Sequence, residues 1–209
     1  IYRIVISDLE RRRPIWFGGE DRSEESMDMF YEWLGENKAK KIQLAVMDMW
    51  KAFEKSTREN APGAAILYDK FHVIRHLGDA LDKVRKMEYS RLSGNDRSYI
   101  KGQKYTLLSN RENLTLDGKK SLKKLLKANK RLNAAYLLKE SFGQLWSYQT
   151  EGWARRFFDN WKSALKWQRL EPYEKFAKMI ERHWDGIAAY SRPENKVSLG
   201  FVEGLNNKI

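Results

Sequence analysis

The stretch Ile42–Trp50 reads IQLAVMDMW, in which an apolar run leads to an acid, Asp48. A short apolar run of this kind is typical of a buried strand, so Asp48 is expected at the carboxyl end of that strand. A second run, Ala64–Tyr68, reads AAILY and is followed in the same way by Asp69. Sheets of α/β proteins bind ligands at the carboxyl ends of their strands, which makes both acids candidates for chemistry.

The segments around these two strands complete an α/β order. Tyr2–Asp8 and Pro14–Gly18 are rich in β-branched and aromatic residues, which predicts a hairpin. Ser23 is a candidate cap for a helix that ends near Lys40, and a further helix is expected over Lys51–Asn60. The order strand, strand, helix, strand, helix, strand predicts an α/β fold with a mixed sheet.

After the second strand the pattern changes to helices. Polar, turn-rich residues over Ser90–Arg111 predict a loop or short helix, and Ser191–Asn195 is a candidate hinge. The expected architecture is a sheet domain of residues 1–72 plus 197–209, interrupted by an all-α insertion of residues 73–196. Apolar residues recur at helical spacing in five stretches of that insertion: 74–84, 122–126, 132–145, 153–165 and 176–187.

The chain of 209 residues carries a net charge of +12, and the excess lies in the insertion. Residues 73–196 contain 27 Lys and Arg against 14 Asp and Glu, whereas the rest of the chain contains 13 against 14. Such an excess suits a polyanion such as DNA or RNA, because neutralised phosphates release their counterions. A basic surface that only keeps the protein soluble explains the charge almost as well.

Composition excludes some kinds of site and location. Because the chain has no cysteine, any metal must be held by oxygen or imidazole. No apolar run approaches 18 residues and no secretion signal opens the chain, so neither membrane insertion nor secretion is expected. The chain starts in a strand pattern without Met and stops inside a motif, as we expect of a fragment.

The last residues, Phe201–Ile209, read FVEGLNNKI and place Glu203 at the start of an expected helix. Asn206 and Asn207 follow one turn later on the same face of that helix. The nearby Lys208 can contact a phosphate as a point charge. The simpler alternative for this motif is the start of an ordinary surface helix.

Asp48 and Glu203, far apart in the sequence, can meet over a divalent metal. Two carboxylates on one metal suit the cleavage and transfer of phosphodiester bonds. The alternative role for Asp48 is to cap the helix expected over residues 51–60, which Asp does well.

The three histidines have both functional and structural explanations. His72 lies three residues after Asp69 and can hydrogen-bond it, or lie beside a metal site as an acid–base or orienting group. A partly buried structural histidine is an equal alternative. His72 and His76 have the spacing of a zinc pair, but no third ligand is apparent. His183 lies in an amphipathic stretch and is expected to be structural.

Aromatic and cationic residues are interleaved in the insertion. Such residues can stack on unpaired bases and hold the nucleic-acid backbone. Helical spacing explains most of the tryptophans more simply as core, which leaves one exposed for an unpaired base. The tryptophans are Trp146, Trp153, Trp161, Trp167 and Trp184, and the candidate DNA-binding cations, besides Lys208, are Arg155, Arg156, Lys162, Lys166 and Arg169.

Three motifs carry a family resemblance. They are Val46–Lys51 (VMDMWK), Tyr68–Val73 (YDKFHV) and Val202–Ile209 (VEGLNNKI), accompanied by SDLERRR near the start and WARRF in the insertion. With the Trp- and Arg-rich helices between these motifs, the chain resembles bacterial insertion-sequence transposases of the ISL-three group along its whole length.

The resemblance implies a ribonuclease-H-like core with an Asp-Asp-Glu triad, interrupted by a helical insertion before the last acid. Asp48 then matches the second acid and Glu203 the third, and both are expected to bind metal. Asp69 and His72 match an Asp-x-x-His signature. The family's first acid is expected on a strand upstream of this chain, since Asp8 lies at the hairpin turn.

The same resemblance implies DNA strand cleavage and strand transfer during transposition, with two Mg²⁺ (or Mn²⁺) ions held by three carboxylates of the intact protein. The implied partners are transposon ends, target DNA and further copies of the protein, in the bacterial cytoplasm and away from membranes. The chain alone is expected to be inactive, because one metal ligand is missing. A DNA-binding relic without catalysis and a ribonuclease-H-like nuclease or resolvase remain as alternatives.

Overall fold

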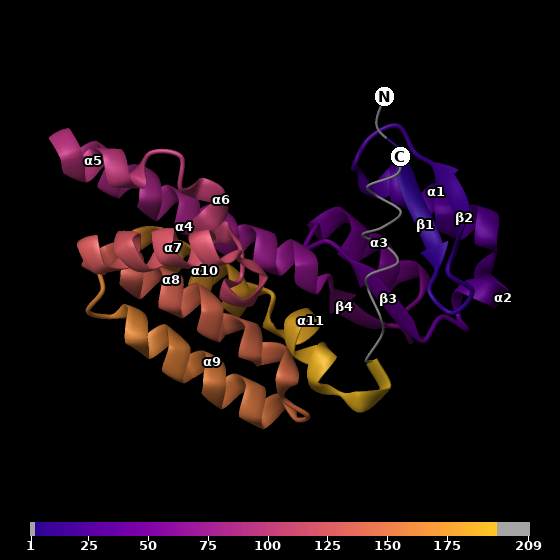
Figure 1. Cartoon of the computed structure of the whole chain (residues 1–209). Coiled ribbons are helices and arrows are strands. Elements are labelled where there is room, and N and C mark those ends of the chain that lie inside the picture. Colours follow the sequence, from indigo (N-terminus) through magenta and orange to yellow (C-terminus); the bar gives the residue numbers. More distant parts are fainter. Residues whose placement is uncertain (1–2, 196–209) are drawn as a thin grey trace. The chain divides into compact units, whose positions relative to one another are not determined.

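The computed structural model describes residues 3–195, apart from the side chains of residues 95 and 96. The described residues divide into two compact units (Figure 1). One contains the chain up to His72 and again from His183, and the other is Val73–Arg182. The second boundary therefore lies earlier than the expected start of the returning segment at residue 197. No helix among the described residues is both long enough and apolar enough to cross a bilayer.

The described part of the first unit contains four short strands in two separate sheets. Strands β1 (Ile4–Asp8) and β2 (Arg13–Gly18) form the expected antiparallel hairpin, with an irregular register between Ile6 and Ser7. Strands β3 (Leu44–Met47) and β4 (Ala65–Tyr68) pair in parallel. The expected mixed sheet is thus present as two pairs, because among the described residues no strand joins β1 or β2 to β3 or β4.

Asp8 lies where the hairpin turns, as expected. Its carboxylate accepts hydrogen bonds from the backbone N–H groups of Glu10 and Arg11, at 3.0 and 2.9 Å. Arg12 completes the turn with a positive φ of 52°. Asp8 is therefore a turn residue that satisfies local backbone donors.

Helix α1 (Glu24–Leu34) begins at Ser23, whose hydroxyl accepts from the N–H of Ser26 as the sequence predicts. The helix ends at Gly35, which has a φ of 82°. A short second helix, α2 (Glu36–Ala39), follows. The prediction of one helix to Lys40 is wrong, because Gly35 adopts a left-handed φ that ends the first helix.

Helix α1 holds the core of the first unit together. It packs on the hairpin and on α3 (Lys51–Asn60), whose bounds agree with the prediction. The Tyr31 hydroxyl donates a buried hydrogen bond of 2.8 Å to Thr57 of α3. The fully packed members of the core are Ile4, Met27, Phe30, Tyr31, Ala39 and Ala61.

The segment after His183 packs against β4. In α11 (Trp184–Ala188), a Cβ added to Gly186 would lie 2.5 Å from the Tyr68 ring, so only glycine allows this approach. The Tyr68 hydroxyl donates to Glu54 at 2.7 Å, and burial together with this carboxylate raises the pKa of Tyr68 well above its usual range. This packing assigns residues 183–195, which include η3 (Ala189–Ser191) and η4 (Pro193–Asn195), to the first unit.

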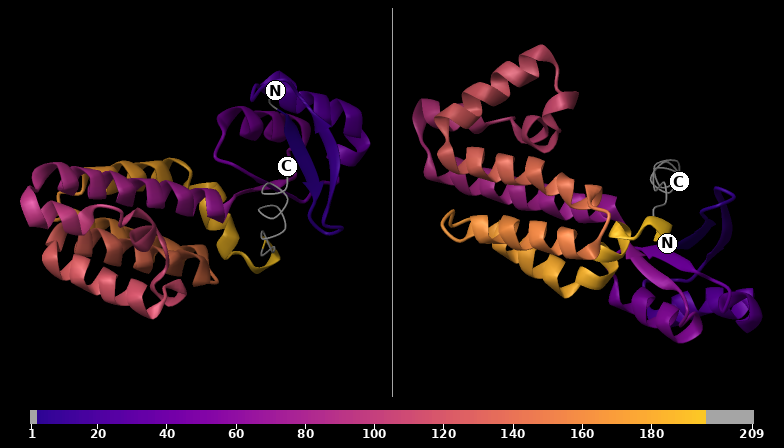
Figure 2. Two further views of the ribbon diagram at one scale, coloured as in Figure 1. Left: turned by 45° about the horizontal axis from the view of Figure 1, so that its top comes forward. Right: turned by 90° about the horizontal axis from the view of Figure 1, so that it is seen from below.

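The second unit is helical throughout its described residues (Figure 2). The polar stretch after residue 90 forms short helices. Asn129 separates the helices that contain the expected stretches 122–126 and 132–145, because its side chain caps the second helix by accepting from the N–H of Leu132. The elements are α4 (Lys70–Arg91, which begins in the first unit), α5 (Gly94–Ile100), α6 (Lys104–Leu108), η1 (Arg111–Asn113), α7 (Leu116–Ala128), α8 (Lys130–Phe142), η2 (Gly143–Ser147), α9 (Glu151–Leu165) and α10 (Glu171–Arg182).

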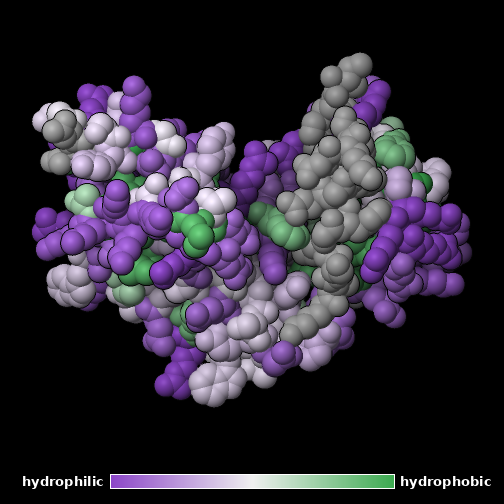
Figure 3. All heavy atoms as spheres, in the orientation of Figure 1, coloured by the Kyte–Doolittle hydropathy of each residue, from purple (hydrophilic) through white to green (hydrophobic). Residues whose placement is uncertain are grey.

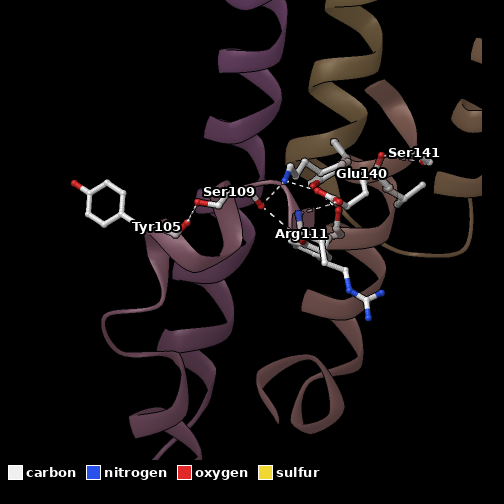
Figure 4. A network of polar contacts seen from close by, with 10 residues as sticks. Tyr105, Ser109, Arg111, Glu140 and Ser141 are labelled. Atoms are coloured by element: carbon white, nitrogen blue, oxygen red, sulfur yellow. Dashed lines mark hydrogen bonds and ion pairs between the residues drawn. The ribbon is translucent and has the colours of Figure 1, made fainter. Parts of the chain in front are cut away.

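Two polar networks fix α8 within this unit. The buried Lys139 ammonium donates to the Ser109 carbonyl at 2.9 Å and to Glu140 at 2.6 Å, and the Arg111 N–H also donates to Glu140 (Figure 4). At the other end, the buried Glu88 carboxylate of α4 accepts from Asn129 at 3.0 Å and lies 3.2 Å from the Arg131 guanidinium. Buried polar groups joined in this way favour one arrangement of the helices.

Candidate active site

The site begins with two acids at one edge of the parallel sheet. Asp48 follows β3 and Asp69 follows β4, and the register pairs Met47 with Tyr68 immediately before them. The Asp69 N–H donates to the Met47 carbonyl at 2.9 Å, which extends the ladder to the last residue before Asp48. The strands therefore bring both acids to the same carboxyl-terminal edge, as predicted.

The Asp48 carboxylate lies between two basic side chains. Its Oδ1 is 3.3 Å from Nδ1 of His72, and its Oδ2 accepts from Nη2 of Arg22 at 3.2 Å. The Asp48 side chain keeps 37% of its surface exposed, so solvent or a ligand can reach it. A half-exposed carboxylate with an imidazole beside it has the donor chemistry of a catalytic or metal site.

The structure decides against the capping alternative for Asp48. The residue that caps α3 is Trp50, and its side chain makes no capping hydrogen bond. The Trp50 N–H donates to the backbone carbonyl of Asp48 at 2.7 Å, which turns the chain into the helix through the backbone alone. The carboxylate of Asp48 is therefore directed to Arg22 and His72 instead of to the first turn of α3.

Asp69 acts on the helix that carries His72. Its Oδ1 accepts from the N–H of Phe71 at 3.0 Å, which satisfies one of the free donors at the start of α4. His72 follows in the first turn of the same helix. Asp69 therefore helps to fix the turn from which His72 reaches Asp48, so His72 lies beside the predicted metal-binding acid, which is one of the two positions expected for it.

Arg22 is the residue of this site that the sequence analysis missed. Its guanidinium lies 4.5 Å from the centre of the Trp50 ring, and the Trp50 indole N–H donates to the Arg22 carbonyl at 2.6 Å. The indole thus holds Arg22 beside Asp48 from both its backbone and its side chain. No spacing rule connects residues 22 and 48, so the only available signal was the tryptophan two positions after the acid.

A divalent ion would find part of a coordination sphere here. Asp48 offers carboxylate oxygens and His72 an imidazole, and both suit Mn²⁺, while Mg²⁺ prefers the oxygens. Within residues 3–195, no three acidic or histidine side chains gather closely enough to hold a metal by themselves. Glu203, Asn206, Asn207 and Lys208 lie outside the described residues, so the remaining ligands of the predicted site are not among those placed.

Comparison with known proteins gives a family that fits this site. The family model for transposases of the ISL3 (ISL-three) group matches residues 2–209. The chain belongs to this transposase family. The resemblance drawn from the motifs around Asp48, Asp69 and Glu203 is thereby confirmed.

Curated members of the family align over the whole chain. A transposase for insertion sequence element IS1001 of Bordetella parapertussis is 32% identical over 211 residues. A transposase for element IS1557 of Mycobacterium tuberculosis is 27% identical over 232 residues. The alignments include all of this chain and 51% of each relative, so the chain spans about half their length. No solved structure gives a significant match.

The cations predicted to bind DNA in this family member are mostly occupied with other groups. Arg155 lies 3.1 Å from Asp159, and Lys162 lies 2.6 Å from Glu181. Lys166 lies over the ring of Trp167 at 5.5 Å. The structure therefore gives these side chains local partners within α9, α10 and the turn between them.

Arg156 is placed differently from the other α9 cations. Its guanidinium lies 5.5 Å from the centre of the exposed Trp153 ring. Together with Thr150 and Gly152, these two side chains line a shallow open depression of about 290 Å³.

Arg169, the last of the predicted DNA-binding cations among the described residues, follows α9 with a positive φ of 51°. Its backbone carbonyl accepts a hydrogen bond from Arg131.

The five tryptophans of the insertion are mostly buried, as predicted, but more of them are exposed than expected. Trp146, Trp161 and Trp184 are buried, which confirms core positions for most of the five. Trp153 and Trp167 are exposed by 58% and 82%, so two rather than one are accessible. His183 lies between α10 and α11 with its ring edge-on to Tyr68, at 5.4 Å between centres, as a structural residue would.

Proposed function

We propose that this chain is the catalytic region of an insertion-sequence transposase, which cleaves DNA strands and joins them to a target with two Mg²⁺ or Mn²⁺ ions. The observation that carries the proposal is the Asp48 carboxylate, which ends β3, does not cap α3 and lies within reach of His72. The relatives named as transposases supply the reaction class.

The four residues placed at the site have different roles in the proposed reaction. Asp48 supplies a metal-binding carboxylate, and His72, with its proton on Nδ1, orients that carboxylate by donating to Oδ1. Asp69 fixes the first turn of α4. Arg22 balances the charge of Asp48 while that carboxylate has no cation. Bound metal ions would activate a water or a 3′-hydroxyl and stabilise the leaving oxygen.

The remaining ligands belong to residues outside those described and come from the family resemblance. Glu203 would supply the last carboxylate of the triad, with Asn206 and Asn207 beside it on the same helix. The first acid would come from a strand that precedes Tyr2 in the complete protein. For this reason we propose that residues 1–209 alone do not cleave DNA efficiently.

The two strand pairs are compatible with a ribonuclease-H-like core. Among the described strands β1 pairs with β2 alone and β3 with β4 alone, so β1 and β3 each keep one edge without a strand. An added strand that pairs with both edges would join the pairs into a single mixed sheet. Unpaired strand edges favour such an addition, because their N–H and C=O groups lack partners. The proposed first acid lies on this added strand.

The test is Asp48→Asn in the complete protein, assayed for cleavage of DNA that carries the element's ends. We expect cleavage to fall by several orders of magnitude while DNA binding is retained, because Asn keeps the shape of Asp but lacks its charge. Glu203→Gln should behave in the same way. Asp8→Asn is the matched control, since Asn also accepts the turn hydrogen bonds that Asp8 makes.

Three outcomes separate the proposal from its alternatives. Normal cleavage by Asp48→Asn would refute the assignment of the site. A wild-type protein that binds DNA but never cleaves it would be a relic of a transposase. Cleavage of branched DNA without joining to a target would indicate a nuclease or resolvase on the same fold.

A further inference from the structure

Helix α7 carries a row of lysines that the predicted site does not include. Five of its thirteen residues are exposed lysines, and we refer to them together as the α7 lysine stripe. They follow one another in the sequence KKSLKKLLK. The members of the stripe are Lys119, Lys120, Lys123, Lys124 and Lys127.

The stripe occupies one side of the helix. Successive residues of a helix are rotated by about 100°, so Lys119, Lys123 and Lys127 lie in one row with about 6 Å between neighbours along the axis. The buried residues Leu122 and Leu125 lie on the opposite side and pack into the helical unit. The fold therefore presents all five ammonium groups on the outer face of α7.

These lysines have few neighbours of opposite charge. Lys120 lies 3.7 Å from Asp117, in an exposed pair. The other four have no ion-pair or hydrogen-bond partner among the described residues. From Leu114 to Lys139, both included, the sequence contains eight Lys and Arg and a single acid, Asp117. This contrasts with Lys162 of α9, which is neutralised by Glu181 at 2.6 Å.

Leaving these charges without partners has a cost for the free protein. Lys119 and Lys123, Lys120 and Lys124, and Lys123 and Lys127 are like charges four residues apart, a spacing that destabilises a helix. A bound polyanion would remove this repulsion. Hydrophilic side chains gather in Figure 3 over the region of the helical unit that α7 and α8 occupy in Figure 1.

We propose that the α7 lysine stripe binds the phosphate backbone of duplex DNA. A helix of thirteen residues is about 20 Å long. Duplex DNA carries one negative charge per about 1.7 Å of its axis, so several phosphates lie within reach of such a row. This inference rests on the proposed function only for the choice of DNA as the polyanion.

A membrane surface fits the same helix less well. Amphipathic helices bind membranes by burying an apolar face in the lipid. The apolar face of α7 is already buried against its own unit through Leu122 and Leu125, with relative exposures of 3% and 2%. Apart from the exposed Leu116 in its first turn, the helix therefore offers charge without a free apolar face, which suits phosphates in water.

The experiment replaces Lys119, Lys123 and Lys127 together by Gln in the complete protein. Gln keeps a similar helix propensity, so α7 should remain folded. Affinity for a short duplex of arbitrary sequence is measured by fluorescence anisotropy at several salt concentrations. Because each lost lysine–phosphate contact lowers the slope of log affinity against log salt by about 1, we expect a total decrease of about 3.

The control is Lys86→Gln together with Lys175→Gln, which removes charge from two exposed lysines of the same unit that lie outside α7. These two pair with Asp82 and Glu171. We expect the control to keep the wild-type salt slope. The melting temperature of the stripe variant should be unchanged or higher, since its substitutions relieve repulsion.

The results that would reject the α7 lysine stripe as a DNA-binding surface differ from those that would reject the proposed DNA cleavage. Wild-type affinity and salt slope in the stripe variant, an equal loss in the control, or no duplex binding by the wild type would each reject the stripe as the contact surface. Tighter binding to anionic lipid vesicles or to single-stranded RNA than to duplex DNA would reject it as well. A stripe confirmed in a protein that never cleaves DNA leaves this inference intact and removes the proposed catalysis.

Discussion

Glu88 and Asp48 are two acids that meet basic groups in different ways. Glu88, in the helical unit, is buried and lies between Asn129, Arg91 and Arg131. Asp48, in the first unit, remains 37% exposed, with Arg22 on one oxygen and His72 on the other. An enclosed and fully satisfied acid stabilises a fold, whereas an accessible acid at the end of a strand can bind a ligand.

The largest expected loss of stability comes from replacing Glu88, which tests whether this buried acid holds the helical unit together. Glu88→Ala leaves the Arg131 guanidinium and the Asn129 amide without their shared carboxylate. Removing one member of a buried charged pair costs about 3–5 kcal/mol, and the exposure of Arg91 places the expected loss near the lower value. Chemical denaturation of the variant measures this loss. A change below about 1 kcal/mol would show that Glu88 does not hold α4 to α8.

A smaller loss of stability is expected where α11 packs against Tyr68 of β4, the strand that ends before Asp69. Gly186→Ala forces a methyl group against the Tyr68 ring, which lies 2.5 Å from the added Cβ. Overpacking of this kind costs about 1–3 kcal/mol and should be seen as a lower midpoint of thermal unfolding. Gly152→Ala is the control, because nothing lies within 4 Å of its added Cβ and alanine favours a helix. Equal midpoints for the two variants would contradict the described packing.

A pH effect should appear in the same region. Burial opposes the ionisation of Glu54, but hydrogen bonds from Tyr68 and Arg58 outweigh it, so the pKa of Glu54 is lowered. A carboxyl whose pKa is lower in the folded state stabilises the fold above its unfolded pKa, and this stability is lost as the pH falls through the folded value. Glu54→Gln should therefore flatten the dependence of the unfolding free energy on pH below about 5.

Denaturation at several acidic pH values measures that dependence. Tyr68→Phe is the matched variant, since it removes one hydrogen bond to Glu54 without removing the carboxylate. It should show a smaller flattening of the same sign. An unaltered pH profile in Glu54→Gln would mean that other carboxyls, such as Asp82 with its lowered pKa, account for acid unfolding.

The smallest expected change in stability comes from replacing Arg22, which tests whether the exposed acid Asp48 has a structural role. Arg22→Gln breaks an ion pair in which both side chains are 37% exposed. Pairs of this kind contribute about 0–1 kcal/mol, so the unfolding free energy should change by no more than that. A loss as large as that of Glu88→Ala would make Asp48 a structural acid and weaken its assignment to the site.

The sequence predicted the elements whose signals are local. β3, α3 and β4 follow from short apolar runs and a polar helix between them, and Asp48 and Asp69 follow from their ends. The break at Gly35 was visible only as a glycine, which a helical pattern often tolerates, and its φ of 82° shows that this one ends the helix. The separation of the strands into two pairs depends on long-range pairing that no local pattern records.

Contacts between residues far apart in the sequence account for the other differences between the expected and the observed positions of charged side chains. Arg22 reaches Asp48 only because α1 and β3 belong to one folded unit. Arg155 and Lys162 looked like free cations in the sequence, but the fold places Glu181 of α10 beside them. The lysines of α7 were equally visible, but their lack of partners became clear only when the neighbouring helices were placed. A count of charges therefore predicted a basic unit without locating its accessible surface.

The position of Mn²⁺ in a crystal of the complete protein, located by its anomalous scattering, tests most directly whether Asp48 binds the catalytic metal. We expect the ion to be coordinated by the Asp48 carboxylate together with Glu203, on the same side of β3 as His72. A fully occupied Mn²⁺ site that does not include Asp48, with Asp48 still bound to Arg22, would contradict it.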